Sequence, residues 1–442
     1  MLSREDNDLV TQTGPGTPCG GLMRSYWQPA ALVSELPAER PVIPVRLLGE
    51  DLVLFRNDAG EYGLIGRFCA HRGVDLSYGR LENGGLRCLY HGWLYDNGGR
   101  CLEQPAEPVH SRFHTKIKHT SYPCVARNGI VFAYLGGGEA PPFPDYDCFV
   151  APEEYTFAFK GLWECNWLQG VEGGIDPSHV SFLHRFLQED PRDVYGQQFR
   201  EEVEGSGKTL SELVSENYRP DIEVEPTEYG LRVFAIRALG EHLRHVRITN
   251  LAFPNAFTVP FGNTKVFTQW HVPIDDVNHY WYMILYDFEH VTDKETLLQQ
   301  RLEGCTLPDY RPVRNRHNSW GFDPREQAEL TYTGMGLDIN VHDQWAVESM
   351  GRIQDRTVER LGVSDRAVTA NRRMLIRAID DHAAGKTTPG MVAGDVPAEA
   401  LRGPLAVDMI SPTEGWHENW RGYEAERRRR SPWAGAGSHA VV

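Results

Sequence analysis

The sequence lacks any long apolar run, and this absence argues against a membrane protein. In 442 residues with 41% hydrophobic content, no stretch offers the roughly 20 consecutive apolar residues that a membrane-spanning helix needs. Residues 1–14 are polar and carry both charge signs, unlike the apolar core of a secretory signal peptide. We therefore expect a soluble, cytoplasmic protein that has no membrane partner.

The sequence is also poor in positive charge and in cysteine. Lys and Arg number 45 against 61 Asp and Glu, and the net charge of −16 repels nucleic acids. We expect no nucleic-acid partner, and we expect the basic run Arg427–Arg430 to be a solvated helix end. Eight cysteines are too few for a disulfide framework in a chain of this length.

Two short motifs, each with one cysteine and one histidine, stand sixteen residues apart. The first contains Cys69 and His71, the second contains Cys88 and His91, and a glycine follows each. Two thiolates and two imidazoles can hold a two-iron, two-sulfur cluster of the Rieske type, in which Cys binds one iron and His binds the other. Such a cluster makes the chain an electron carrier.

A structural zinc site is the alternative, because two Cys and two His also bind zinc. Zinc sites usually combine motifs that each supply two like ligands, whereas here each motif supplies one Cys and one His. We favour the cluster, and a zinc-stabilised binding module remains the alternative.

Changes in pattern along the chain predict an α+β fold with two domains. Short alternating runs between Gly, Asn and Asp turns predict a small all-β domain, and a Gly- and Pro-rich stretch at 136–144 ends it. Longer alternating runs between 230 and 288 predict one large antiparallel sheet. The predicted segments are an N-terminal extension packing on the core at 1–40, the all-β domain at 41–140, a second domain at 150–390 and a C-terminal tail at 391–442.

A second metal-binding pattern lies in the second domain. His179 and His184 are five residues apart, and Asp176 precedes the first of them by three. Two imidazoles and a carboxylate hold iron(II) and leave positions open for dioxygen and a substrate. Because residues five apart point roughly 140° apart on a regular helix, we expect the Gly-Gly pair at 173–174 and Pro177 to break or widen the helix.

The carboxylate ligand lies far downstream, and spacing alone does not choose among Asp338, Asp343 and Asp355. In a helix, Asp343 shares one stripe with Val347 and Met350, so it would face inward. A buried carboxylate needs a cation, and Asp343 is therefore the favoured ligand.

Together the motifs resemble those of the Rieske non-heme iron ring-hydroxylating oxygenases. The resemblance runs from Glu5-Asp6-Asn7 through both metal motifs to residues 353–356, and Ala70 stands where related proteins commonly have proline. The branch it most resembles contains phthalate 4,5-dioxygenases, chlorobenzoate dioxygenases and O-demethylases of lignin-derived acids such as dehydrodivanillate. It implies a Rieske [2Fe-2S] domain and a catalytic domain whose large antiparallel sheet is flanked by helices in a helix-grip-like arrangement.

The resemblance also implies the cofactors and their ligands. A [2Fe-2S] cluster would bind Cys69, His71, Cys88 and His91, and a mononuclear Fe(2+) would bind His179, His184 and Asp343. The family pattern of an Asp followed five residues later by a Glu matches Asp343 and Glu348.

In the family, an Asp at the position of Asp176 bridges an iron-ligating His and a cluster-ligating His of the neighbouring subunit, here His91. A carboxylate between two imidazole N–H groups fixes both tautomers and shortens the electron path. Asp176 is thus the expected catalytic residue, and the resemblance implies a homotrimer.

The implied reaction is the oxidation of an aromatic carboxylate by O2, with electrons from an NADH-dependent reductase, directly or through a ferredoxin. We expect O-demethylation of a methoxylated, lignin-derived aromatic acid. The alternatives are cis-dihydroxylation of a phthalate- or benzoate-type ring, and a Rieske electron-transfer protein without oxygenase activity. Arg200, Arg244 and Arg247 are candidates for binding the substrate carboxylate, because the arginine side chain binds carboxylates through two parallel hydrogen bonds, and Arg200 and Arg247 are the favoured two.

Overall fold

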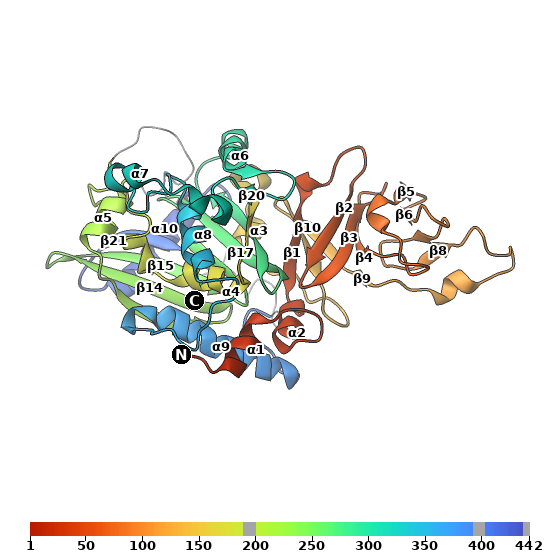
Figure 1. The fold of residues 1–442 in the computed structure, drawn as a ribbon. Coiled ribbons are helices and arrows are strands. Elements are labelled where there is room, and N and C mark those ends of the chain that lie inside the picture. The colour runs from red at the N-terminus through yellow and green to blue at the C-terminus, as the bar shows by residue number, and fades with distance from the viewer. Residues whose placement is uncertain (189–199, 392–402, 436–442) are drawn as a thin grey trace. The chain divides into compact units, whose positions relative to one another are not determined.

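The structure is a computed structural model that describes residues 1–188, 200–391 and 403–435, and it divides the chain into two compact units (Figure 1). The chain passes between the units after Pro141, inside the Gly- and Pro-rich stretch. The smaller unit consists of Gln12–Pro141 and Val272–Asp275, and the larger unit consists of Met1–Thr11, Pro142–His271 and Asp276–Val442.

The smaller unit is built of three small antiparallel sheets, with strand orders β2-β3-β4-β9, β1-β11-β10 and β5-β6-β7-β8. The third sheet carries the second Cys/His motif between β6 and β7. Residues 1–40 were expected as an extension, but residues 27–32 form a strand of this unit because they pair with β11. The elements are α2 Pro18–Arg24, β1 Trp27–Leu32, η1 Val33–Glu35, β2 Val42–Leu47, β3 Glu50–Arg56, β4 Tyr62–Gly66, η2 Leu76–Tyr78, β5 Arg80–Glu82, β6 Gly85–Arg87, β7 Leu94–Tyr95, β8 Cys101–Glu103, η3 Phe113–Lys116, β9 Ser121–Tyr122, β10 Cys124–Arg127 and β11 Ile130–Tyr134.

The larger unit is built on one antiparallel sheet of eight strands, in the order β12-β18-β17-β16-β15-β14-β13, with β21 paired to β15. This sheet and the helices around it confirm the predicted α+β class. The strands of this sheet are β12 Thr156–Trp163, β13 Asp221–Thr227, β14 Gly230–Leu239, β15 Leu243–Ala252, β16 Ala256–Pro260, β17 Lys265–Asp275, β18 Asn278–Asp287 and β21 Val407–Pro412. Two further strands, β19 Cys305–Thr306 and β20 Arg311–Pro312, pair with each other in a separate small sheet. The helices are α1 Arg4–Thr11, α3 Asp147–Val150, η4 Glu153–Tyr155, α4 Trp167–Ile175, η5 His179–Ser181, α5 Leu210–Glu216, α6 Lys294–Glu303, η7 Arg316–Gly321, α7 Pro324–Glu329, α8 Ile339–Ser349, η8 Val363–Asp365, α9 Arg366–Ala383 and α10 Trp416–Arg430.

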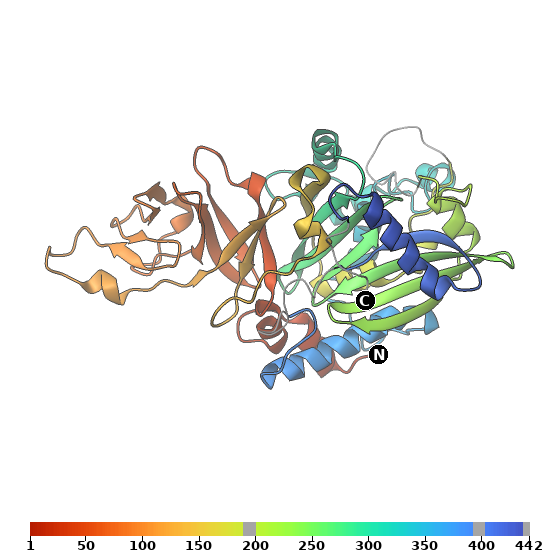
Figure 2. The ribbon, with the colours of Figure 1, turned by 180° about the vertical axis from the view of Figure 1, so that it is seen from behind.

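The two faces of the large sheet differ in chemistry because successive side chains of a strand point to opposite faces. One face is apolar: Phe234, Val246 and Met409 pack there against Trp416 and Trp420 of α10, which lies across the sheet in Figure 2. On the other face, α4 lies against β15 and β16, and α8 packs on α4. Arg237 of β14 and His245, Arg247 and Thr249 of β15 share the alternate phase and point toward this second face, so it is the one that can hold a reactive site.

The described residues within 391–442, which are 391 and 403–435, differ from the tail that the sequence predicted. Residues 407–412 form β21, whose pairing with β15 buries Val407 and Met409 under α10. The basic run also differs from the expected solvated end, because Arg427 lies 4.2 Å from the Phe288 ring centroid and Arg428 forms an ion pair with Asp147. The residue limits of the four predicted segments otherwise stay a prediction. In the part of the chain described, no helix combines the length and the apolar character needed to cross a membrane.

Candidate metal centres and active site

The two Cys/His loops of the smaller unit close in the same way. In each, the Cys N–H donates to the carbonyl five residues later at 2.8 Å, and the glycine four residues after the Cys donates back to the Cys carbonyl. Those glycines, Gly73 and Gly92, both have φ of +73°, a left-handed conformation that glycine adopts without strain. The shared Cys-to-Gly spacing therefore reflects a shared loop geometry.

The side chains of the two loops fit a cluster with two chemically distinct irons. Cys69 and Cys88 are buried, each 3% exposed, whereas the rings of His71 and His91 lie nearer the surface with centroids 4.5 Å apart. Nδ1 of His91 is buried and has no hydrogen-bond partner in the described residues. A buried nitrogen of this kind is unfavourable unless a metal binds it, so these residues fit the group predicted from sequence.

The surroundings of the thiols bear on how they would bind iron. Burial raises the pKa of the Cys88 thiol, while the backbone N–H groups of Tyr90 and His91 act in the opposite direction. The hydroxyl of Tyr95 lies 3.2 Å from Sγ of Cys69. Thiols bind metals as thiolates, so iron would have to offset the burial, with the loop N–H groups contributing.

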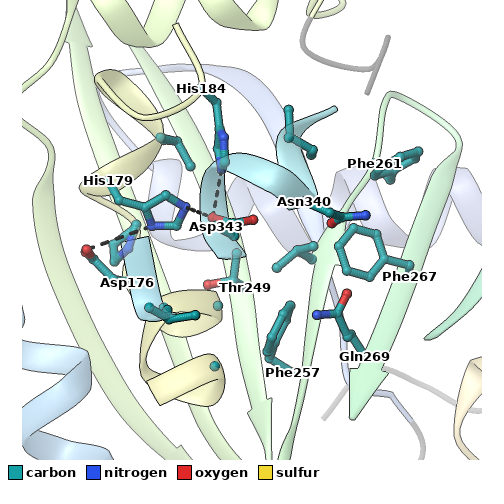
Figure 3. Close-up of a pocket in the computed structure, with 18 of the residues that line it drawn as sticks. Asp176, His179, His184, Thr249, Phe257, Phe261, Phe267, Gln269, Asn340 and Asp343 are labelled. Carbon is teal, nitrogen blue, oxygen red and sulfur yellow. Dashed lines mark ion pairs between the residues drawn. The ribbon is translucent and has the colours of Figure 1, made fainter. Parts of the chain in front are cut away.

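His179, His184 and Asp343 converge in the larger unit (Figure 3). Nε2 of His184 lies 3.2 Å from Oδ1 of Asp343, and Nε2 of His179 lies 3.7 Å from the same oxygen. Among the residues described, they form the one group of three or more His, Cys, Asp or Glu side chains whose ligand atoms all lie within 4.8 Å of one another. Two imidazoles and one carboxylate suit iron(II) and leave coordination positions open.

The break in the chain after α4 brings the two histidines together. α4 ends at Ile175, and Asp176 adopts φ −79° and ψ 113°, the extended conformation imposed on a residue that precedes proline. The helix therefore breaks, and does not widen, before His179 begins the short turn η5. A Cβ on Gly174 would lie 1.9 Å from the Phe257 ring, so only glycine lets α4 approach β16 this closely.

Asp176 contacts the other side of the His179 ring. Its Oδ2 lies 3.8 Å from Nδ1 of His179, while its Oδ1 accepts a hydrogen bond from the Ser178 N–H at 2.8 Å. Asp176 is thus placed beside the trio and does not point into it (Figure 3).

The other two candidates for the carboxylate ligand lie elsewhere. Asp338 caps α8 and forms an ion pair with Arg301, and Asp355 forms an exposed pair with Arg4. Burial, the largest single influence, would raise the pKa of Asp343, but the facing imidazoles of His184 and His179 outweigh it and lower that pKa. A carboxylate held ionised in this way is suited to a metal ion.

A cavity of about 80 Å³ opens beside the trio. Phe257, Val259, Phe261 and Phe267 make its walls largely apolar. Figure 3 shows Phe257, Phe261 and Phe267 on the side of the trio away from Asp176. Apolar walls with a few polar groups suit a small apolar or aromatic ligand. Its polar lining outside the trio includes Arg247, Thr249, Gln269 and Asn340.

The structure separates the two arginines predicted for the substrate. Of the described residues, those lining the cavity include Arg247 and not Arg200, whose guanidinium lies 5.6 Å from the Phe186 ring centroid. Arg247 donates to Asp408 and, at 2.9 Å, to the carbonyl of Pro260.

A buried polar cluster surrounds Arg247. Asp408 also contacts Nε2 of His245, and Arg237 pairs with His245 in the register of β14 and β15. Arg237 donates to the carbonyl of Pro177 at 3.1 Å, but its Nε and Nη1 have no hydrogen-bond partner within the described ranges.

Sequence reasoning missed Gln269 and Asn340. Gln269 alternates with Phe267 and His271 along β17, so the period of the strand places all three on one face. That signal was present in the sequence, but which face of the sheet meets α4 depends on contacts distant in the chain.

Comparison with known proteins gives two family matches. Residues 26–120 match the Rieske [2Fe-2S] domain, and residues 133–438 match a family described as LigXa C-terminal domain like. The phthalate 4,5-dioxygenase oxygenase subunit of Pseudomonas putida is 34% identical over 446 residues, which cover 96% of this chain and 95% of that protein. The 5,5'-dehydrodivanillate O-demethylase oxygenase subunit of Sphingobium sp. (strain NBRC 103272 / SYK-6) is 31% identical over 402 residues, covering 89% and 84%.

Two solved structures share the fold at lower identity. NdmA of Pseudomonas putida CBB5 is 18% identical with a TM-score of 0.54, covering 83% of this chain and 94% of that one. An oxygenase from a complex of carbazole 1,9a-dioxygenase with its ferredoxin is 21% identical with a TM-score of 0.54, covering 87% and 98%. At these identities the likeness concerns the fold alone.

Proposed function

The chain belongs to the Rieske oxygenase subunits with a LigXa-like catalytic domain, and on this basis we propose that it demethylates a methoxylated aromatic acid. The observation that carries the proposal is the trio of His179, His184 and Asp343 at a cavity that combines aromatic walls with Arg247. The relatives named above oxidise phthalate and demethylate dehydrodivanillate, both of which are aromatic carboxylates.

The charge of the buried cluster supports a carboxylate substrate. Burial and then the positive charge of Arg247 lower the pKa of Arg237 to about 10, and burial lowers the pKa of His245. With His245 neutral, Asp408 pairs with Arg247, while Arg237 feels the charges of Asp408 and Asp176 without an ion pair to either in the described residues. A substrate carboxylate beside Arg247 would add a counter-charge to this buried cluster.

The residues around the cavity then have distinct tasks. The phenylalanine side chains hold the ring and exclude water, and Arg247 binds the acid, so the orientation of the ring decides which carbon lies nearest the iron. Iron bound to His179, His184 and Asp343 would supply dioxygen activation, using electrons stored by the cluster. The carboxylate of Asp176 faces Nδ1 of His179 at 3.8 Å, a nitrogen that has no hydrogen-bond partner in the described residues, and would orient that imidazole.

The test is turnover and binding with the full chain loaded with both cofactors. With a reductase and O2, methoxylated benzoates are expected to release formaldehyde. Arg247→Met is expected to weaken carboxylate binding by about ten-fold to a hundred-fold and to leave binding of the matching benzyl alcohol unchanged. Arg244→Met is the control, because within the described residues Arg244 donates to the backbone carbonyls of Gly240 and Leu243 and to no side chain. Equal loss for the acid and the alcohol would contradict the role of Arg247.

Ring cis-dihydroxylation is the second candidate. The phthalate dioxygenase subunit is 34% identical to this chain and the demethylase subunit 31%, and a 3-chlorobenzoate-3,4-dioxygenase oxygenase subunit of Comamonas testosteroni is 30% identical. A diol from phthalate or benzoate, with no formaldehyde from methoxylated acids, would favour this reaction over demethylation.

We also propose how the chain works with other proteins. Its relatives are the oxygenase parts of multi-component systems, and the carbazole oxygenase is in complex with a ferredoxin. An NADH-dependent reductase, directly or through a ferredoxin, would reduce the cluster. A homotrimer and a cytoplasmic location stay predictions; a mass in light scattering three times that of one chain would support the trimer.

A further inference from the structure

A chain of hydrogen bonds runs from the cavity wall into the interior through two buried histidines. Nε2 of Gln269 lies 3.1 Å from Nε2 of His271, and Nδ1 of His271 lies 2.9 Å from Nε2 of His279. Nδ1 of His279 lies 2.8 Å from the carbonyl oxygen of Cys165. Both imidazoles are 0% exposed and Gln269 is 4% exposed.

The carbonyl of Cys165, at the inner end of this series of hydrogen bonds, fixes the direction of every hydrogen bond in the series. A carbonyl only accepts, so His279 carries its proton on Nδ1 and its Nε2 must accept. His271 therefore donates from Nδ1 and accepts at Nε2, and the group that donates to it is the amide NH2 of Gln269. The orientation of the Gln269 amide thus follows from a backbone carbonyl three hydrogen bonds away.

Burial and packing hold the two histidines in this state. Burial lowers the pKa of His279 to about 4 and, with His279 beside it, lowers the pKa of His271 well below its usual value, so both rings are neutral. Gly170 approaches so closely that a Cβ there would lie 2.2 Å from Nδ1 of His271, and the Phe257 ring stacks on that imidazole with centroids 5.5 Å apart. Close packing by these two neighbours restricts the orientation of the His271 ring.

Gln269 consequently offers an acceptor to the cavity. Its amide nitrogen is committed to His271, and its side chain reaches toward the space between Phe257 and Phe267 (Figure 3). Within the described part of the chain, no hydrogen bond reaches Oε1 of Gln269. An acceptor at an apolar cavity favours a ligand that brings a donor to it.

We propose that Gln269 is a specificity-determining residue whose Oε1 accepts a hydrogen bond from a hydroxyl group on the ring of the aromatic acid, with His271 and His279 as positioning residues that hold the amide in this orientation. The inference rests on the proposed function, because it adds a ring hydroxyl to the aromatic acid already proposed. Arg247 and Gln269 would then recognise two different substituents of one ring.

Binding of two acids that differ in one methyl group tests the role of Gln269. The full chain with both cofactors is titrated by calorimetry with 4-hydroxy-3-methoxybenzoate and with 3,4-dimethoxybenzoate, which lacks the hydroxyl. The hydroxy acid is expected to bind about ten-fold more tightly or better. Gln269→Met should remove the preference. Gln299→Met makes the same change at an exposed position of α6 and should keep it.

His279→Phe tests the positioning role. Without the acceptor on His279, His271 is free to carry its proton on Nε2, and the Gln269 amide would then turn its NH2 toward the cavity. The ratio of the two affinities is expected to fall at least ten-fold toward the dimethoxy acid. His242→Phe, at an exposed position, is the control. If the substitution only loosened the cavity, binding of both acids would weaken equally, and that result would overturn the positioning role.

The remaining outcomes separate this inference from the proposed function. If both acids bind the wild type equally well, the inference fails and the aromatic acid oxygenase stands. If neither acid binds, the inference and the proposed function both fail. A neutron crystal structure of the wild type should show the proton on Nδ1 of both histidines, and a proton on Nε2 of His271 would overturn the inference even if the variants do not fold.

Discussion

At the scale of single residues, Asp343 is the carboxylate on which the proposed iron site depends. We expect Asp343→Asn to lose the mononuclear iron and to keep the cluster, since an amide oxygen is a much weaker ligand than a carboxylate and all cluster ligands lie in the other unit. Iron and sulfide analysis, with the visible spectrum of the cluster, measures both centres. Iron should fall by one atom per chain while sulfide stays constant.

Asp338→Asn is the matched control for that experiment. Asp338 caps α8 through the Asn340 N–H, and asparagine caps helices about as well as aspartate, so the helix should survive the change. Iron content equal to the wild type is expected. Loss of iron from the Asp338 variant alone would mean that the wrong carboxylate has been assigned.

The sequence predicted individual residues well where a motif has a fixed local geometry. The two loops with Cys69 and Cys88 are local, and so is the break between His179 and α4. Arg247 and Arg200 looked equivalent, because their difference depends on which residues line the cavity. Gln269 was missed because its meaning depends on a hydrogen-bond chain to Cys165, more than a hundred residues away in the sequence.

At the scale of elements, Glu172 joins α4 to two distant segments. It accepts from Arg356 at 2.9 Å and from Arg372 of α9 at 2.6 Å, and Arg356 is 0% exposed. Glu172 is not among the described residues that line the cavity, so its role is to hold these segments together next to the site. We expect Glu172→Gln to lower the free energy of unfolding by about 3 kcal/mol at pH 7, because it removes the carboxylate that pairs with buried Arg356 and leaves Arg372 with Glu359 alone.

The pH dependence of this loss identifies its cause. Burial alone would raise the pKa of Glu172, but Arg356 and Arg372 outweigh it and hold the pKa below its usual 4.5. The ion pair therefore stabilises fully above pH 4.5, and its contribution falls as the pH drops further. In urea unfolding, the difference in the free energy of unfolding between wild type and variant should become smaller as the pH is lowered. A difference that grows at low pH would contradict the ion pair. Glu426→Gln is the control: Glu426 forms an exposed ion pair with Arg429, and this variant should unfold with the same free energy as the wild type.

A helix or strand could be predicted where its own sequence pattern determines its structure. It could not be predicted where its structure depends on a partner far away in the sequence. The alternating strands between 230 and 288 formed the expected sheet because each pairs with a near neighbour in sequence. β21 has the same alternation, but its partner β15 precedes it by about 160 residues. The local sequence pattern therefore predicted a tail at this position and no strand. Arg427 and Arg428 were misjudged for the same reason, since Phe288 and Asp147 are far from them in the chain.

At the scale of the whole molecule, the two metal sites lie in different units of the chain. The cluster motifs lie within Gln12–Pro141, and the trio lies in the other unit. The resemblance to Rieske oxygenases implies that electrons cross between subunits, from the cluster of one to Asp176 and His179 of the next. In the homotrimer that we expect, such transfer would join each subunit to its neighbour head to tail around a ring.

Mixed assemblies test this path. Cys88→Ser removes a cluster ligand and Asp343→Ala removes an iron ligand, so each variant alone should be inactive. In a ring of three that contains both variants, one junction always joins an intact cluster to an intact iron site in the productive direction. Assemblies purified through two different tags should therefore show about one third of the wild-type activity. If electrons instead stay within one chain, no subunit of a mixed ring holds both centres, and the assemblies would be as inactive as the separate variants.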